Sequence, residues 1–360
     1  MSRPPQGFAW RPVATALGVG LVGAGIFHVA TLPLAWILGA MFAVTIAAVA
    51  GLKMAIPGIV RTVCVTVLGV LLGSGFTPEI FDRLSGWAIT ASFMLVYVVV
   101  TGILLAAALR RLAGYDPVTA YFAAMPGGIT EMTMIGTAMG GDGRTIALIH
   151  GARILLVALT IPVGFRFFGG YMPQGMQGMG GGLFDLAAVD AMLLLACGAL
   201  GWAIGPRIRL PAPQMMGALL LSAAAHATGL MDAKPPALLS AAAQLGIGAA
   251  IGCTFAGVRP SVLARTLAVA VGTIGTMLLL TLLVSIGLAA LTGWPAAAIL
   301  LAYAPGGVTE MSLVALAIGV DVVFVATHHI IRFSFVILIA PATARLLGRR
   351  GVLPLRRPPV

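Results

Sequence analysis

Two glutamates lie inside apolar stretches of this chain, and both belong to the same seven-residue motif. The first motif, residues 126–132, reads Pro-Gly-Gly-Ile-Thr-Glu-Met, and the second, residues 305–311, differs only in having Val for Ile. Because proline lacks a backbone donor and glycine adopts conformations closed to other residues, each motif predicts a broken helix. A broken helix beside a carboxylate at membrane depth is typical of ion and substrate sites.

A second short helix is expected to begin after each glycine pair, with a threonine and the glutamate in its first turn. Its free N–H groups and positive dipole end would favour an anion or a carboxylate there. A structural alternative stays open, in which the threonine and the glutamate only cap the half-helix. The candidate binding residues of the two motifs are Gly127, Gly128, Thr130, Glu131, Gly306, Gly307, Thr309 and Glu310.

An arginine lies near the middle of the helix that follows each motif. Arg153 and Arg332 would be costly within a membrane if they had no partner. Glu131 and Glu310 are the candidate partners within each half, and pairing across the halves is equally open. Each pair is either a structural ion pair, or one of its arginines binds the carboxylate or phosphate of a solute.

A histidine precedes each of these arginines by three residues. His150 therefore shares a helix face with Arg153, as His329 does with Arg332. A histidine that titrates near neutrality can relay protons. The commoner role of a membrane histidine is an interhelical hydrogen bond, so both roles are kept open.

No residue pattern points to a cofactor, a metal or an enzyme. The cysteines Cys64, Cys197 and Cys253 lie singly in apolar runs, without the spacing of a disulfide framework or a zinc site. Sequences of the nucleophile-elbow, zinc-protease and phosphate-loop types are absent. We therefore expect no cofactor, no metal site and no catalytic activity.

The composition is that of a membrane protein. Of the 360 residues, 60% are hydrophobic and 9% are charged, and the mean hydropathy is +1.08. Apolar runs of about 18 to 25 residues recur along the chain, which predicts an all-α polytopic protein in a lipid bilayer. The net charge of +11 comes mostly from arginines in short loops. We interpret these as cytoplasmic anchors rather than as a nucleic-acid surface.

The apolar runs predict two halves of six segments each, one of them broken. Residues 12–168 and 184–347 form the two membrane repeats, residues 169–183 a Gly- and Met-rich linker, and residues 348–360 a basic cytoplasmic tail. The predicted segments are 13–30, 34–50, 58–75, 87–109, 118–139 (broken) and 145–165, then 186–204, 212–229, 237–255, 262–291, 296–318 (broken) and 322–346.

The two halves match well beyond the motif, which indicates an internal duplication. Leu32-Pro33 and Gly39-Ala40 recur as Leu210-Pro211 and Gly217-Ala218, 178 positions later. Four further residues recur 179 positions later, and the two aspartates among them are expected to cap the last helix of each half. These residues are Asp142, His150, Arg153 and Pro162, followed by Asp321, His329, Arg332 and Pro341.

The positions of the arginines bear on the direction of the second half. If every segment crosses the membrane, the halves are parallel and Arg207, Arg209, Arg259 and Arg265 fall outside. If both broken segments are re-entrant hairpins, five crossings remain in each half, the second half is inverted, and nearly all arginines, Arg61 included, lie inside. The positive-inside rule favours the inverted arrangement, with both termini cytoplasmic. A kinked helix that crosses fully is the rival, and it would require another segment not to span.

With both motifs and the repeated Leu-Pro and Gly-Ala pairs in view, residues 12–347 resemble the AbrB-type duplicated membrane proteins of bacteria. Members of that family are variously labelled ammonia monooxygenases or regulators of gene expression. The chain has neither a copper-type ligand set nor a soluble DNA-binding domain to support those labels. The resemblance implies a bacterial inner-membrane location and kinship with inverted-repeat secondary carriers, but it implies no substrate.

These features favour a secondary transporter of a small anionic or zwitterionic organic solute. Glu131 and Glu310 would bind a coupling proton or sodium ion, Arg153 and Arg332 would hold the solute, and alternating access would follow from movement of one bundle against another. A membrane sensor that affects gene expression through a partner is the alternative, and a channel is a third. Aromatic and arginine side chains at helix ends suit either lipid anchoring or a homodimer face.

Overall fold

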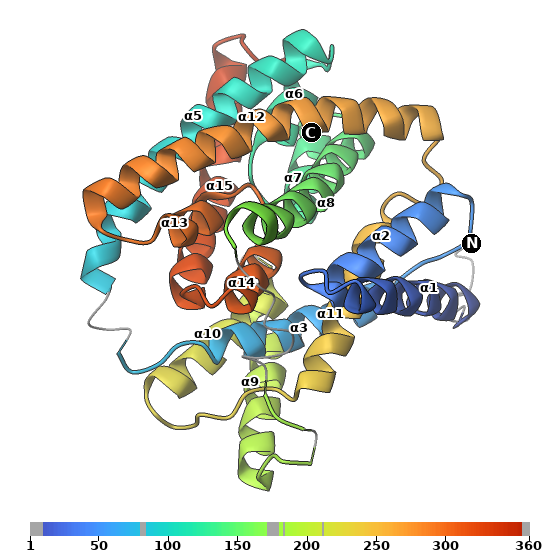
Figure 1. Cartoon of the computed structure of the whole chain (residues 1–360). Coiled ribbons are helices and arrows are strands. Elements are labelled where there is room, and N and C mark those ends of the chain that lie inside the picture. Colours follow the sequence, from blue (N-terminus) through green and yellow to red (C-terminus); the bar gives the residue numbers. More distant parts are fainter. Residues whose placement is uncertain (1–9, 80–83, 171–179, 183, 211, 355–360) are drawn as a thin grey trace.

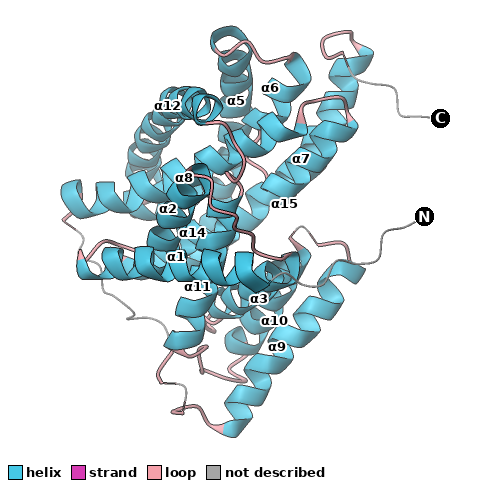
Figure 2. Cartoon of the chain, turned by 90° about the vertical axis from the view of Figure 1, so that its right-hand side faces the viewer, coloured by secondary structure: helices cyan, strands magenta, loops and turns pink. Residues whose placement is uncertain are grey.

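The computed structural model describes residues 10–79, 84–170, 180–182, 184–210 and 212–354, and Figures 1 and 2 show this part of the chain as helices joined by loops. It contains fourteen α-helices, a single 3-10 turn and one isolated β-bridge between Gly180 and Pro236. The predicted all-α fold is confirmed. Residues 171–179, 183 and 355–360, which include most of the predicted linker and part of the predicted tail, lie outside the described residues.

The helices of the second half repeat those of the first in order, and most counterparts are similar in length, although α12 with 33 residues is longer than α5 with 25. Helices α6 and α13 have 8 residues each, and α7 and α14 have 10 each. The first half comprises α1 (Trp10–Val29), α2 (Ala35–Val49), α3 (Gly58–Gly73), α5 (Ala88–Leu112), α6 (Pro117–Ala124), α7 (Ile129–Ala138) and α8 (Gly143–Phe168). The second half comprises α9 (Ala188–Arg207), α10 (Pro213–Ala227), α11 (Ala237–Cys253), α12 (Pro260–Thr292), α13 (Ala296–Tyr303), α14 (Val308–Ala317) and α15 (Val322–Arg349).

Within the described residues, six helices are long and apolar enough to cross a membrane: α1, α5, α8, α9, α12 and α15. Helices α2, α3, α10 and α11 have 15 to 17 residues. At 1.5 Å per residue they reach about 22 to 26 Å, which is less than the roughly 30 Å of a hydrocarbon core. Ten crossings therefore stay a prediction, although a polytopic membrane protein is supported.

The helices gather in two bundles, and each bundle takes helices from both halves (Figure 1). The six-helix bundle consists of α1, α2, α3, α9, α10 and α11. The hairpin bundle consists of α5 to α8 and α12 to α15, and its core buries the large side chains Phe122, Tyr303 and Phe324. The duplication is thus used to build two interlocked bundles rather than two separate domains.

Close helix crossings explain the glycines of the repeated Gly-Ala pairs. A Cβ on Gly39 of α2 would collide with the backbone of Gly23 in α1. Its counterpart Gly217 of α10 lies in the same way against Gly201 of α9. Only glycine permits backbones to approach so closely, as at other small-residue crossings of membrane helices.

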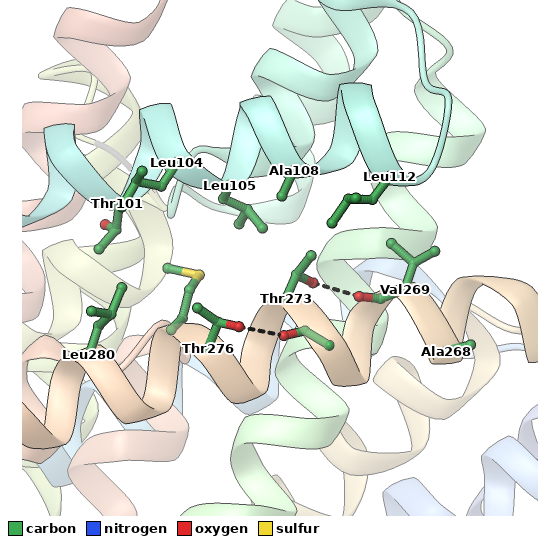
Figure 3. Close-up of a pocket in the computed structure, with 12 residues that line it drawn as sticks. Thr101, Leu104, Leu105, Ala108, Leu112, Ala268, Val269, Thr273, Thr276 and Leu280 are labelled. Atoms are coloured by element: carbon green, nitrogen blue, oxygen red, sulfur yellow. Dashed lines mark hydrogen bonds between the residues drawn. The ribbon is translucent and has the colours of Figure 1, made fainter.

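Contacts between the halves set the direction of several helices. Tyr97 Oη of α5 lies 2.6 Å from Thr281 Oγ1 of α12, whereas Arg265, near the start of α12, donates to the carbonyl of Ala113 just past the end of α5. These two counterpart helices are therefore antiparallel, as Figure 3 also shows, with Leu112 opposite Val269. By contrast α3 and α10 run parallel, because Gly69 lies against Met215 and Gly73 lies against Leu219.

Each broken segment returns to the place where it began. The backbone N–H of Asp142, just before α8, donates to Thr119 Oγ1 at the start of α6, with an N···O distance of 2.7 Å. In the second half Trp294, before α13, stacks on Phe324 in the first turn of α15, with ring centroids 4.9 Å apart. Residues 117–138 and 296–317 are therefore helical hairpins with the motifs at their tips.

The two aspartates have the predicted role. Asp142 accepts hydrogen bonds from the Arg144 N–H and the Thr145 hydroxyl, and it is the N-cap of α8. Asp321 accepts from the N–H groups of Val323 and Phe324 at the start of α15. Both carboxylates satisfy backbone donors that a helix start leaves free.

Candidate functional site

Both motifs line one cavity of about 370 Å³ between the two bundles. The hairpin bundle contributes the two hairpin tips together with Arg153 of α8 and Arg332 of α15. The six-helix bundle contributes the N-terminal turns of α3 and α10 and the C-terminal half of α11. Residues separated by 179 positions in sequence thus meet at a single site, as the duplication predicted.

The hairpin tips explain the residue types of the motif. Helices α7 and α14 begin after the N-caps Gly128 and Gly307, with the glutamates in the first turn as expected. Each carboxylate folds back over its own N-cap, so a Cβ on Gly128 or Gly307 would collide with Oε2 of Glu131 or Glu310. This carboxylate position beside the helix start suits the positive end of the half-helix in both copies.

Each arginine binds the chain just before its hairpin tip. The Nη1 and Nη2 groups of Arg153 donate to the carbonyls of Met125 and Gly127 over 3.2 and 3.4 Å. Arg332 donates in the same way to Ala304 and Gly306 over 2.5 and 2.7 Å. These carbonyls belong to the ends of α6 and α13, where a broken helix leaves acceptors without partners.

Each histidine orients its arginine and anchors the hairpin. His150 Nδ1 accepts from Arg153 Nη2 at 2.9 Å, and the same distance separates His329 Nδ1 and Arg332 Nη2. Because an arginine can only donate, each imidazole is neutral and carries its proton on Nε2. That N–H donates to the carbonyl of Phe122 or Leu301, at 3.0 and 2.9 Å. The geometry matches the interhelical hydrogen bond expected of membrane histidines and leaves no free nitrogen for proton relay.

The expected pairing of arginine with glutamate is not what the structure shows. Among the hydrogen bonds of the described residues, the terminal nitrogens of Arg153 and Arg332 go to carbonyls and histidines. The physical reason is that the hairpin break exposes carbonyls facing the arginines, while each glutamate faces its own helix start. The buried Nε atoms of both arginines have no hydrogen-bond partner.

The two copies of the site differ in exposure. Glu310 and Thr309 are each 6% exposed, whereas Thr130 is exposed and Glu131 is partly exposed. Further along the same stripe, Met134 of α7 is 65% exposed and its counterpart Leu313 of α14 only 1%. The described residues of the first hairpin are therefore more exposed than their counterparts in the second.

Several cavity residues lie outside the set of candidate binding residues, and Arg61 and Gln214 are the charged and the amide side chain among them. Arg61, in the first turn of α3, fits the pattern of a cytoplasmic anchor, and Gln214 lies in the first turn of α10. The sequence signal for both is weak, because each lies at the end of an apolar run where polar residues are ordinary. Only the parallel packing of α3 and α10 brings their first turns to the motifs.

The other pockets offer less chemistry. The groove between α5 and α12 in Figure 3 is lined mainly by apolar side chains. The hydroxyls of Thr273 and Thr276 there donate to carbonyls of their own helix, at 2.8 and 2.9 Å. In the part of the chain that the structure describes, no cluster of three His, Cys, Asp or Glu side chains could hold a metal ion. The cavity at the motifs therefore remains the candidate site.

Comparison with known proteins identifies the family. The family described as "Transition state regulatory protein AbrB" matches residues 36–348. The chain is similar to "Uncharacterized protein YhjN" of Bacillus subtilis (strain 168), with 28% identity over 301 residues, 78% of this chain and 77% of that protein. It is also similar to "Putative regulator AbrB" of Escherichia coli (strain K12), with 23% identity over 326 residues, 88% of this chain and 91% of that protein. The chain therefore belongs to the AbrB family.

Proposed function

We propose that this protein is a secondary transporter of a small anionic or zwitterionic organic solute, driven by protons or sodium through alternating access. The observation that carries the proposal is the cavity between the bundles, where two copies of one motif meet with unequal exposure. A static binding protein has no need of two such copies, whereas a carrier uses them in turn. The protein would act without catalysis, with the solute, the ion and the bilayer as its partners and a homodimer as its expected assembly.

Helix directions support an inverted pair of halves. The counterpart helices α5 and α12 are antiparallel, as Tyr97 with Thr281 and Ala113 with Arg265 indicate. Inversion places the arginines of the loops on one face, which the positive-inside rule assigns to the cytoplasm, with both termini there. The first hairpin then enters from the cytoplasmic face of the inner membrane, and the open side of the cavity faces the cytoplasm.

The opposite state follows from exchanging the roles of the halves. The counterparts of the cavity residues Arg61 and Val65 are Ser240 and Gln244 of α11, 179 positions later. Both are buried, and the Ser240 hydroxyl has no hydrogen-bond partner. We infer that they line a second vestibule on the outer side, closed in this state and opened when the bundles move.

The glutamates are proposed to bind the coupling ion. Uptake into reconstituted vesicles under an imposed proton or sodium gradient should be abolished by Glu131→Gln and by Glu310→Gln. Asp190→Asn, in the first turn of α9 and outside the cavity, is the matched control and should transport normally. Unaltered uptake in both glutamine variants would contradict the proposal that the glutamates bind the coupling ion.

A membrane sensor or regulatory protein is the second candidate, and the name "Putative regulator AbrB" of the Escherichia coli relative is what favours it. A sensor would bind its ligand without moving it. Ligand-dependent stabilisation of the purified protein, combined with no flux under any gradient, would favour this candidate over the carrier.

A further inference from the structure

The cavity carries one positive charge that its own groups do not balance. Its charged lining residues are Arg61, Glu131, Arg153, Glu310 and Arg332, which is three cations against two anions. Arg153 and Arg332 are bound to hairpin carbonyls, whereas Arg61 is exposed to the cavity and has no hydrogen bond or ion pair among the described residues. Arg61 is therefore the cation free to meet a ligand, and it lies within electrostatic reach of Glu310.

Arg61 lies where its own helix would prefer an anion. It is in the first turn of α3, whose N-cap Pro57 provides no side-chain hydrogen bond and whose first turn has no acidic residue. The same holds for α10, whose N-cap is Ala212 and whose first turn contains Gln214. A cation at a helix start is unfavourable, and two uncapped parallel starts side by side add to the positive potential.

Donors without partners at the cavity also point to a ligand. Gln214, which lines the cavity as Arg61 does, makes no hydrogen bond within the described part of the chain. The Nε atoms of Arg153 and Arg332 also lack a partner, but they are fully buried, so a solute in the cavity does not reach them. A pair of side chains whose donors no protein group satisfies is suited to an acceptor that arrives from outside.

We propose that Arg61 and Gln214 form the binding subsite for the carboxylate of a small organic monoanion. This proposal rests on the carrier function above and names its substrate class. One carboxylate would neutralise the excess positive charge and accept hydrogen bonds from the guanidinium group of Arg61. The apolar remainder of the solute would lie against Ile247, Ile251 and Phe333, which line the same cavity. A volume of about 370 Å³ suits a small molecule.

Equilibrium binding to the purified full-length protein tests the subsite. The probes are monocarboxylates of three to six carbons, their neutral amides, dicarboxylates, amino acids and inorganic phosphate, measured by calorimetry and by thermal unfolding. A monocarboxylate should bind and its amide should not. Arg61→Gln should weaken that binding at least tenfold, and Arg61→Lys should weaken it less, because a lysine keeps the charge without the fork. Gln214→Leu should weaken it several-fold.

Arg207→Gln is the matched control, since Arg207 is an exposed arginine in the last turn of α9 that donates to its own helix. Its affinity should equal that of the unchanged protein. Undiminished monocarboxylate binding in Arg61→Gln, no binding of any monocarboxylate, or a preference for phosphate or amino acids would each overturn the proposal.

Binding and flux separate this proposal from the carrier function. Carboxylate binding lost in Arg61→Gln, with no flux in the unchanged protein, would support the subsite and refute the carrier. Carboxylate flux that persists with unchanged affinity in Arg61→Gln would refute the subsite and support the carrier.

Discussion

Arg332 and Arg153 occupy equivalent positions, but they hold their hairpins to different degrees. The donor–acceptor distances to the two hairpin carbonyls are 2.5 and 2.7 Å for Arg332 and 3.2 and 3.4 Å for Arg153. Because the planar guanidinium spans two carbonyls at once, a lysine cannot replace it. Both arginines therefore position the hairpin tips, and their predicted contact with a solute stays a prediction.

Arg332→Lys should lower the stability of the purified protein, because it leaves buried carbonyls without donors at a cost of about 1–3 kcal/mol each. Arg153→Lys should cost less, since its hydrogen bonds are longer. Thermal unfolding measures both, with Arg207→Lys as the exposed control. Equal stability of the Arg332 and Arg207 variants would contradict the positioning role.

Gly307→Ala should abolish uptake while the protein still folds, because the added methyl displaces the Glu310 carboxylate from its helix start. Gly164→Ala of α8 is the matched control, since a Cβ there meets nothing within 4 Å. It should leave uptake unchanged and raise stability by about 0.5–1 kcal/mol, as alanine is the better helix former. Normal uptake by Gly307→Ala would show that the carboxylate position is unimportant.

At the scale of elements, the hairpins are closed at their bases by different chemistry in the two halves. Thr119 accepts from the Asp142 backbone in the first, and Trp294 stacks on Phe324 in the second. Each hairpin arm of 8 to 10 residues reaches about 12 to 15 Å, half of a hydrocarbon core. Backbone can be irregular at that depth only where protein or a cavity covers it, which the two bundles provide.

The hairpins predict which residues share a membrane face. In a chain whose three cysteines are replaced by alanine, Leu112→Cys and Arg144→Cys should react with an impermeant maleimide from the cytoplasmic side. Leu291→Cys and Val320→Cys should react from the outer side. Labelling of Leu112→Cys and Arg144→Cys from opposite sides would mean that the first broken segment crosses the membrane.

At the scale of the whole molecule, the two hairpins carry nearly the same motif but differ in exposure. Met134 of α7 is 65% exposed, while its counterpart Leu313 in α14 is buried. Under the proposed carrier function, this difference corresponds to one of two states. Movement of the hairpin bundle against the six-helix bundle would exchange the roles of the two hairpins.

Single-cysteine labelling also tests the two states. Met134→Cys should react from the cytoplasmic side in the absence of a gradient, and Leu313→Cys and Ser240→Cys should be protected. An imposed gradient that drives the opposite state should protect Met134→Cys and allow labelling of the other two from outside. If the labelling of all three cysteines is the same with and without solute or gradient, alternating access is contradicted.

The sequence by itself determined the membrane class, the duplication and the helix breaks, because hydropathy, repeated motifs and Pro-Gly-Gly are local properties. Of the twelve candidate binding residues, all but His150 and His329 line the cavity, since counterpart positions in a duplicated chain are expected to converge. The sequence could not determine their partners. Whether Arg153 faces a glutamate or a carbonyl depends on where a hairpin tip lies in space, and a break in the chain leaves both kinds of acceptor nearby.

Only the tertiary structure brought Arg61 and Gln214 to the site and made one copy of the motif more exposed than the other. Both outcomes depend on how the bundles pack. The parallel contact of α3 and α10 joins helix starts that are distant in sequence, and the exposure of each hairpin depends on what packs over it, as the exposed Met134 and the buried Leu313 show.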